Sequence, residues 1–242
     1  MNTNSNVYTI VYTTVICVLV AAILAFVSQS LKPMQEANDK AETISQILTA
    51  GQFGTKEELA KKGNNGIIDL FKAELDKAVL VNAEGKEVKA LDKAKAQVYS
   101  TSELKAQTYN FANGSYEIPV YIFKNGIHVF PIYGQGLWGP VWGYVATDST
   151  LTTLVGAYFD HASETPGLGG KIKDDPAFRA QFAGKHIDYA KTPAFDIIKG
   201  GAKGQDNAID AITGATMTSK GLSAAINNWL DSYKSYIQSE EK

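Results

Sequence analysis

The chain has 242 residues, of which 45% are hydrophobic and 20% are charged, and its formal net charge is −2. These values are typical of a globular protein with a substantial core. The near-neutral charge argues against a nucleic-acid-binding protein, so we expect no nucleic-acid partner. The single cysteine, Cys17, excludes a disulfide within the chain and a four-cysteine metal site.

An apolar run of 21 uncharged residues covers positions 7–27. As a helix it would be about 32 Å long, close to the thickness of the hydrocarbon core of a bilayer. A cleaved secretory signal is the alternative, but such a signal has a cationic start and a shorter apolar core. Here the first lysine, Lys32, follows the run. We therefore predict a retained single-pass anchor over residues 1–30.

The charges beside the apolar run discriminate little between the two orientations. Lys32 and Lys40 follow the run and no cation precedes it, which favours a cytoplasmic main domain by the positive-inside rule. Three acidic residues lie among or beside these lysines, namely Glu36, Asp39 and Glu42. The charge pattern alone leaves the orientation open.

Residues 31–100 are expected to form a membrane-proximal helical and mixed segment. Pro33 is expected to break the first helix, and a polar helix with apolar residues at helical spacing follows it. A second short helix, with a loop at residues 63–66, is expected in "TKEELAKKGNNGIIDLFKAEL". The stretch "AVLVNAEGKEV" predicts a strand, a turn and a second strand.

The centre of the chain has the pattern of an antiparallel sheet. Two runs rich in β-branched and aromatic residues flank Asn125–Gly126, a pair typical of a tight hairpin turn. Residues 140–161 predict two further strands around a polar turn at Asp148–Ser149. We therefore expect a sheet of about four strands.

Helical patterns follow the predicted sheet. A helix is expected at residues 174–183, capped by Asp174 or Asp175, and then a short strand in "PAFDIIKG". The last helix is amphipathic, with an apolar stripe at Leu222, Ala225, Ile226, Trp229, Leu230, Tyr233 and Ile237. The predicted fold class is α+β: one N-terminal transmembrane helix, then one domain, residues 101–242, with a central antiparallel sheet flanked by helices.

Four hydroxyl residues crowd the stretch "DAITGATMTS" (210–219), just before the last helix. Free N–H groups and the helix dipole favour an anion at such a position. Gly214 and Ala215 lack bulk, so a ligand can approach the main chain closely. The threonine hydroxyls could bind a phosphate or be esterified by one. The alternative is an ordinary cap, in which Thr216 or Thr218 accepts hydrogen bonds from the first-turn amides.

Two further glycine-rich stretches suggest contact with a planar ligand. The glycines of "ETPGLGG" (164–170) can lie flat against such a ligand, and Leu168 between them would be covered by it. The alternative is a plain type II turn at Pro166–Gly167. In "GLWGPVWGY" (136–144), the tryptophans either pack in the core, their commonest use, or face an aromatic cofactor.

Several classes of catalytic site are not indicated. The segment "GGAKGQD" lacks the ending of a nucleotide-binding P-loop, and no dinucleotide-binding glycine fingerprint follows a strand. The histidines, at positions 128, 161 and 186, are not spaced as metal ligands. We expect no metal site and no catalytic acid, base or nucleophile.

The three glycine-rich stretches, taken in order, resemble those of proteins with covalently bound FMN. The segment "DAITGAT" resembles their flavinylation motif, written Asp, two residues, Ser/Thr, Gly, Ala, Thr, and "GQGLWGP" and "ETPGLGG" are similar to the rest of the FMN-binding domain. With its single span, the chain resembles the NqrC family, the C subunits of the Na+-translocating NADH:quinone reductase. The G subunit of the Rnf electron-transport complex and a cofactor-free, membrane-tethered binding module are the alternatives. The long segment at residues 33–105 favours the first.

The resemblance implies an FMN joined through its phosphate to Thr216, attached by a flavin transferase that uses FAD and Mg2+. This flavin would relay single electrons between an iron centre and a second flavin in a partner subunit of the oxidoreductase complex. The implied location is the bacterial inner membrane, with the soluble domain on the periplasmic side. The motif places Asp210, Thr213, Gly214 and Ala215 at the cofactor, and Thr218 is also expected to contact it. Glu164, Thr165, Leu168 and Gly169 are expected to line the ring, with Trp138 nearby. Lys199 or Lys203 is expected to balance the phosphate charge.

Overall fold

The computed structural model describes residues 6–240. The first five residues of the predicted anchor and the last two residues of the chain therefore lie outside the described residues. The chain divides into two compact units, Met1–Lys40 and Ala41–Lys242. The long first helix, α1 (Asn6–Ala50), runs across the boundary between them.

The first unit is the N-terminal part of α1. Its apolar side chains are exposed, and this helix contains a window with a mean hydropathy of 2.8, so it is long and apolar enough to cross a membrane. The prediction that Pro33 breaks the helix is wrong, because Pro33 lies inside α1. A proline removes one hydrogen bond of the helix, but the side chains around Pro33 are exposed, where solvent can reach the freed carbonyl.

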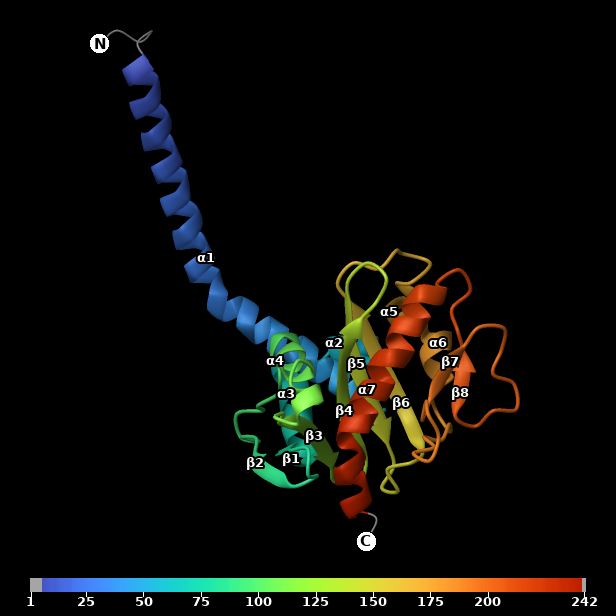
Figure 1. Ribbon diagram of the computed structural model, residues 1–242. Coiled ribbons are helices and arrows are strands. Elements are labelled where there is room, and N and C mark those ends of the chain that lie inside the picture. Colours follow the sequence, from blue (N-terminus) through green and yellow to red (C-terminus); the bar gives the residue numbers. More distant parts are fainter. Residues whose placement is uncertain (1–5, 241–242) are drawn as a thin grey trace. The chain divides into compact units, whose positions relative to one another are not determined.

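The second unit is built on a six-stranded antiparallel sheet with the strand order β2-β1-β3-β4-β5-β6 (Figure 1). The hairpin at Asn125–Gly126 is confirmed, with Gly126 at a φ of 82° and the side chain of Asn125 accepting from the N–H of Ile127. The sheet has more strands than the four expected, because β1 and β2 extend it. Its strands are β1 (Leu75–Val81), β2 (Glu87–Ala90), β3 (Ile118–Phe123), β4 (His128–Gln135), β5 (Pro140–Thr147) and β6 (Leu154–His161).

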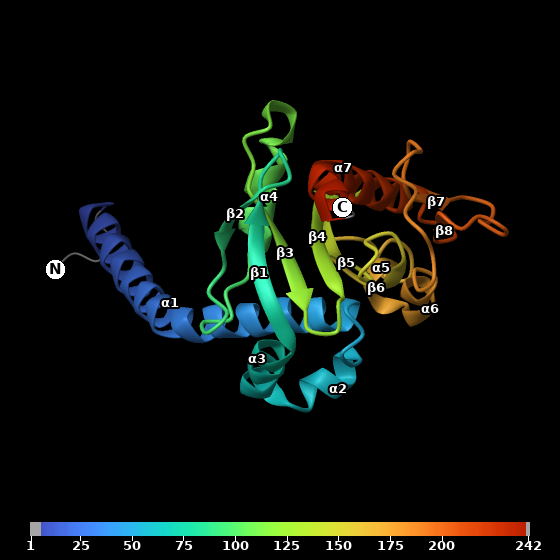
Figure 2. The ribbon, with the colours of Figure 1, turned by 90° about the horizontal axis from the view of Figure 1, so that it is seen from below.

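The C-terminal helix α7 (Thr216–Glu240) covers one face of the sheet (Figure 2). The predicted apolar stripe is confirmed, since all seven of its residues are buried. Trp229 has no exposed surface, and its Nε1 donates to the carbonyl of Tyr133 at 2.8 Å. A Cβ on Gly134 would lie 2.5 Å from the Cβ of Ala225, so glycine allows α7 to approach β4 closely. This packing fixes the start of α7 relative to the ends of the strands.

The other face of the sheet packs against residues 41–50 of α1 and against α3 (Gly63–Glu74). These helices bury their apolar side chains with Tyr121, Phe123, Val129, Tyr144 and Tyr158 of the sheet. Between them lies α2 (Lys56–Ala60), which begins with a complete capping box. The expected loop at residues 63–66 is wrong, because these residues form the first turn of α3.

Shorter elements complete the unit. They are α4 (Thr101–Thr108), the 3-10 turn η1 (Phe111–Asn113), α5 (Lys171–Asp174), α6 (Pro176–Ala180), β7 (Asp196–Ile198) and β8 (Ala208–Asp210). The helix expected at residues 174–183 is only the five-residue α6, and Asp175 caps it as predicted. The strand β7 is confirmed, and it pairs in parallel with β8, which was not predicted. The α+β class, with a central antiparallel sheet flanked by helices, is confirmed.

Candidate functional site

The three glycine-rich stretches meet at one end of the sheet. Gln135 at the end of β4 pairs with Pro140 at the start of β5, and Val141 pairs with His161 at the end of β6. The start of α7 reaches the same end, since a Cβ on Gly221 would lie 2.3 Å from the carbonyl oxygen of Gln135. Figure 1 shows these loops gathered beside the first turns of α7.

Glu164 joins these three stretches. It lies in the loop after β6 and is only 3% exposed. Its Oε1 accepts a hydrogen bond of 2.9 Å from the backbone N–H of Trp138, in the loop between β4 and β5. Its Oε2 accepts a hydrogen bond of 2.6 Å from the hydroxyl of Thr218, in the first turn of α7. One buried carboxylate therefore holds the two other stretches at once.

Two glycines make room for this carboxylate. A Cβ on Gly136 would lie 2.4 Å from Oε1 of Glu164, and a Cβ on Gly169 would lie 2.4 Å from Oε2. The Cβ on Gly169 would also lie 2.6 Å from the hydroxyl oxygen of Thr218. Because real Cβ atoms do not approach neighbours so closely, any larger residue at either position would displace the carboxylate.

Further hydrogen bonds hold the loop around Glu164 in place. The hydroxyl of Ser163 donates to the carbonyl of Trp138 at 2.8 Å, and the N–H of Glu164 donates to Nδ1 of His161 at 3.1 Å. The side chain of His161 thus helps to hold the shape of its own loop. These bonds and the glycine contacts give the glycine-rich end of the sheet a fixed shape.

The hydroxyl groups before and within the first turn of α7 fall into two classes. Thr218 and Ser219 are buried, Thr218 donating to Glu164 and the Oγ of Ser219 accepting from the N–H of Ile212 at 3.2 Å. Thr213 is exposed and Thr216 is partly exposed. Across residues 6–240, neither of these two hydroxyls has a hydrogen-bond partner.

The start of α7 lacks the usual side-chain cap. Ala215 directly precedes the first helical residue, Thr216, and it carries no oxygen that could accept from the first-turn N–H groups. The hydroxyl of Thr218 is engaged with Glu164. The capping alternative therefore gains no support, and the N–H groups of the first turn are available to an anion.

Large apolar side chains are exposed on the loops at this end of the sheet and on the first turn of α7. Trp138 is 66% exposed and Leu168 is 43% exposed, and both belong to the predicted ring-lining set. A Cβ on Gly214 would lie 2.9 Å from Cδ2 of Leu168, so the loop after β6 touches the segment before α7. Of the other predicted residues in that loop, Thr165 is exposed and Gly169 is buried. Leu137 and Met217 add further exposed apolar surface.

Asp210 has a local structural role. Its carboxylate accepts from the N–H of Ala202, and its own N–H donates to the side chain of Gln181 at 2.9 Å. Ala202 lies in the loop between β7 and β8, which carries Lys199 and Lys203, and both lysines are exposed. Asp210 thereby ties this lysine-bearing loop to the end of β8, three residues before Thr213.

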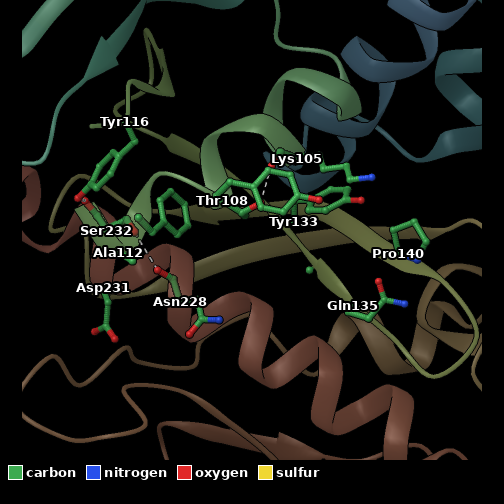
Figure 3. Close-up of a pocket in the computed structure, with 13 residues that line it drawn as sticks. Lys105, Thr108, Ala112, Tyr116, Tyr133, Gln135, Pro140, Asn228, Asp231 and Ser232 are labelled. Carbon is green, nitrogen blue, oxygen red and sulfur yellow. Dashed lines mark hydrogen bonds between the residues drawn. The ribbon is translucent and has the colours of Figure 1, made fainter. Parts of the chain in front are cut away.

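Sequence reasoning missed a groove of about 800 Å³ between α4, β4 and α7 (Figure 3). Tyr116 lies at one end of it, beside Ser232, and its hydroxyl donates to the carbonyl of Ser232 at 2.9 Å. The groove approaches the glycine-rich end of the sheet at Gln135 and Pro140, but none of the predicted cofactor-binding residues lines it.

A buried polar cluster next to the site was also missed. Asp160, which directly precedes His161, is 5% exposed and forms an ion pair of 2.8 Å with Lys173 of α5. Its other oxygen accepts from Gln46 of α1 at 3.2 Å. No local sequence signal could reveal this contact, since Gln46 and Asp160 are 114 positions apart.

Comparison with known proteins gives the same part of the chain a functional context. Residues 136–231 match the model of the FMN-binding domain family. This range begins at the loop that carries Trp138 and includes the loop after β6 and most of α7. The three stretches that Glu164 joins therefore all lie inside the matched domain.

Three similar proteins share one name. The C subunit of the Na(+)-translocating NADH-quinone reductase of Vibrio vulnificus is 39% identical over 102 residues, which is 41% of this chain and 40% of that protein. The protein of the same name from Haemophilus ducreyi is 28% identical over 91% of this chain and 86% of its own length. The crystal structure of the same protein from Parabacteroides distasonis is 30% identical with a TM-score of 0.67, covering 86% of this chain and 96% of that one. The first of these alignments thus covers about two fifths of the curated relative.

Proposed function

Since this chain belongs to the family of C subunits of the Na(+)-translocating NADH-quinone reductase, we propose that it is a membrane-anchored flavoprotein which relays electrons through an FMN esterified to Thr216. The observation that carries this proposal is the first turn of α7. There the uncapped N–H groups and a free hydroxyl coincide at Thr216, the last residue of the flavinylation motif.

The environment of each hydroxyl supports Thr216 as the acceptor. An acceptor oxygen must be reachable by a transferase and its nucleotide substrate. Thr218 and Ser219 are buried and hydrogen-bonded, whereas Thr216 is partly exposed and begins the helix. Thr213 is also exposed, but it precedes the helix and does not occupy the terminal threonine of the motif. A phosphate on Thr216 would lie beside the N–H groups of the first turn, which favour an anion.

The residues around Thr216 fit the remainder of an FMN. Gly214 leaves the main chain open on one side, and the exposed side chains of Leu168 and Trp138 offer apolar surface to a planar ring. When bound, FMN supplies one-electron chemistry. This chain binds and orients the flavin and shields it from water through apolar contact, while fixed dipoles and charges set its potential. Such a relay needs no acid or base from the chain.

Some of the residues that were predicted to bind the cofactor are proposed to hold the loops of the site in place. Glu164 and Thr218 hold each other, and we assign them to the support of the site. Asp210 orients the loop that carries Lys199 and Lys203, which we propose balance the phosphate charge. Thr213, Ala215, Thr165 and Gly169 remain proposed parts of the flavin environment.

The membrane anchor and the assembly also belong to this proposal. The N-terminal part of α1 would span the bacterial inner membrane, with the soluble domain on the periplasmic side. The proposed division is an anchor at residues 1–30, a membrane-proximal segment at residues 31–100 and the FMN-binding domain at residues 101–242. The flavin would take electrons from an iron centre and pass them to a second flavin in a partner subunit of the sodium-translocating complex. A flavin transferase would load the FMN.

The test is mass spectrometry of the chain purified from its native host, or from cells that co-express a flavin transferase. We expect the tryptic peptide that contains Thr216 to carry the mass of FMN, and the denatured protein to fluoresce in a gel under ultraviolet light. An unmodified peptide from flavin-competent cells would favour the cofactor-free binding module instead. The names of the relatives support the reductase family over the G subunit of the Rnf complex.

A further inference from the structure

Glu164 is a buried carboxylate without a cationic partner. It is 3% exposed, and within residues 6–240 no lysine, arginine or histidine forms an ion pair with it. Its two hydrogen-bond donors, the backbone N–H of Trp138 and the hydroxyl of Thr218, are both neutral. Buried carboxylates in proteins are usually paired with a cation, whereas the two donors to Glu164 are both uncharged.

Both oxygens of the Glu164 carboxyl group lie within hydrogen-bond distance of a donor, as the two oxygens of a carboxylate can. The hydroxyl of Thr218 lies 2.6 Å from Oε2, within the range of about 2.5–2.7 Å found for a hydroxyl that donates to an anionic oxygen. A donor also faces the other oxygen, at 2.9 Å, so each oxygen serves as an acceptor.

Two features allow the charge to remain buried. The carboxylate bonds to the first turn of α7, where the helix dipole stabilises a negative charge. Gly136 and Gly169 enclose it so closely that a Cβ on either would lie 2.4 Å from one of its oxygens. Water is therefore largely excluded, and the field of the charge is screened less than it would be at the surface.

We propose that Glu164 is a positioning residue that locks the Trp138 loop to the first turn of α7 and whose unpaired charge lowers the reduction potential of a flavin held at Thr216. The inference rests on the function proposed above. Adding one electron to the flavin adds one negative charge unless a proton follows. A fixed carboxylate bonded to Thr218, two residues from the attachment point, makes that addition less favourable in a poorly screened site.

The test compares the reduction potentials of the full-length wild-type chain and its variants. Each protein is produced together with the transferase, so that it carries the flavin, and is titrated spectroelectrochemically in detergent. Glu164→Gln removes the charge and keeps the shape, so its potential should shift to more positive values. Glu164→Asp keeps the charge but is one methylene too short to reach both donors. It should keep a potential near that of the wild type while losing stability. Glu103→Gln makes the same chemical change at an exposed capping residue of α4 and should leave the potential unchanged.

This pattern separates charge from structure. If Glu164 acts only as a structural link, the Asp and Gln variants will shift the potential alike, or not at all, and the proposal is overturned. Should Glu164→Gln fail to fold, Thr218→Val takes its place, because it removes a donor and leaves the carboxylate. The potential of this variant should fall below that of Thr218→Ser, which keeps the hydroxyl, and equal potentials overturn the proposal.

The result that would refute this inference differs from the result that would refute the proposed function. A wild-type chain without covalent flavin, made in flavin-competent cells, refutes the proposed function and this inference with it. A wild-type chain that carries flavin while its Gln variant has the same potential refutes only the role of Glu164.

Discussion

The hydroxyl of Thr218 donates to the carboxylate of Glu164 at 2.6 Å, and this contact joins the start of α7 to the loop after β6, across 54 positions of the sequence. The same carboxylate holds the backbone of Trp138. The candidate site therefore depends on a few long-range polar contacts, while the hydroxyl of Thr216, the proposed attachment point, has no hydrogen-bond partner within residues 6–240. The stability of the site and the binding of its cofactor can be tested separately.

Thr218→Val should destabilise the fold by about 1–3 kcal/mol, because it leaves a buried carboxylate oxygen without its donor. Urea unfolding of the detergent-solubilised chain, followed by circular dichroism, measures this loss. Thr218→Ser keeps the hydroxyl and serves as the matched control, with a smaller effect. If the Val and Ser variants unfold at the same urea concentration, the hydrogen bond contributes nothing to stability.

Thr216→Val should abolish covalent flavin and leave the fold intact. Valine has nearly the shape of threonine, and the hydroxyl it replaces has no partner within residues 6–240. In-gel fluorescence measures the flavin and circular dichroism the fold. Thr192→Val is the control, since it alters an exposed threonine outside the motif and should keep the flavin. A fluorescent Thr216→Val band would show that the acceptor is another residue.

Much of the fold follows from local sequence patterns. The strands around Asn125–Gly126 and the apolar stripe of α7 were predictable because turn chemistry and side-chain periodicity act over a few residues. The pairing of β7 with β8 was not, because each strand has three residues and the contact between them is decided by tertiary packing. The helix through Pro33 was missed because exposure of the surrounding backbone, which the sequence does not show, lets solvent compensate for the lost bond.

The site shows the same division between local and long-range information. The glycines and hydroxyls of the motif were expected just before the last helix, and Thr216 is the first residue of α7. Glu164, however, was expected to line the ring, and the structure shows both of its oxygens bonded within the protein. A glutamate in a glycine-rich loop gives no sign of its partners 26 and 54 positions away. The sequence pattern predicted these residues to belong to the site, but it did not predict their hydrogen-bond partners.

Gly214→Ala should reduce both stability and flavin loading. Gly214 has a φ of 81°, and an added Cβ would lie 2.9 Å from Leu168. Gly167→Ala is a matched control, because Gly167 has a φ of 74° but open space around its Cβ position. Both variants should lose about 1–2 kcal/mol from the left-handed backbone alone. Only Gly214→Ala should lose further folding stability and also carry less flavin. The ratio of flavin to protein absorbance measures the flavin content.

Glu42 should make folding stability depend on pH in the acidic range. Burial raises its pKa, but the hydrogen bond and the charge of Lys56 outweigh burial, and the net pKa lies below the ordinary value of 4.5. A carboxyl whose pKa is lower in the folded state stabilises the fold above pH 4.5, and this contribution is lost as the pH falls through the folded-state pKa.

Replacing Glu42 tests this dependence. Glu42→Gln should cost at most about 1 kcal/mol at pH 7, because the pair with Lys56 is partly exposed and screened by solvent. The difference from the wild type should disappear in unfolding experiments at the acidic end of the range. Glu117→Gln, at an exposed position, should show no comparable change. A difference for Glu42→Gln that stays constant with pH would mean that the lost interaction is not the ion pair.

A single engineered cysteine can show on which side of the membrane the domain lies. Ser102 lies exposed on α4, in the second unit, and Cys17 is the only native cysteine. In a Cys17→Ser background, Ser102→Cys should react with a membrane-impermeant maleimide in intact spheroplasts, because the domain is proposed to face the periplasm. Lysed membranes provide the control, in which the thiol reacts whichever side it faces. Labelling that requires lysis would place the domain in the cytoplasm, in agreement with the weak lysine bias after the apolar run and against the proposed topology.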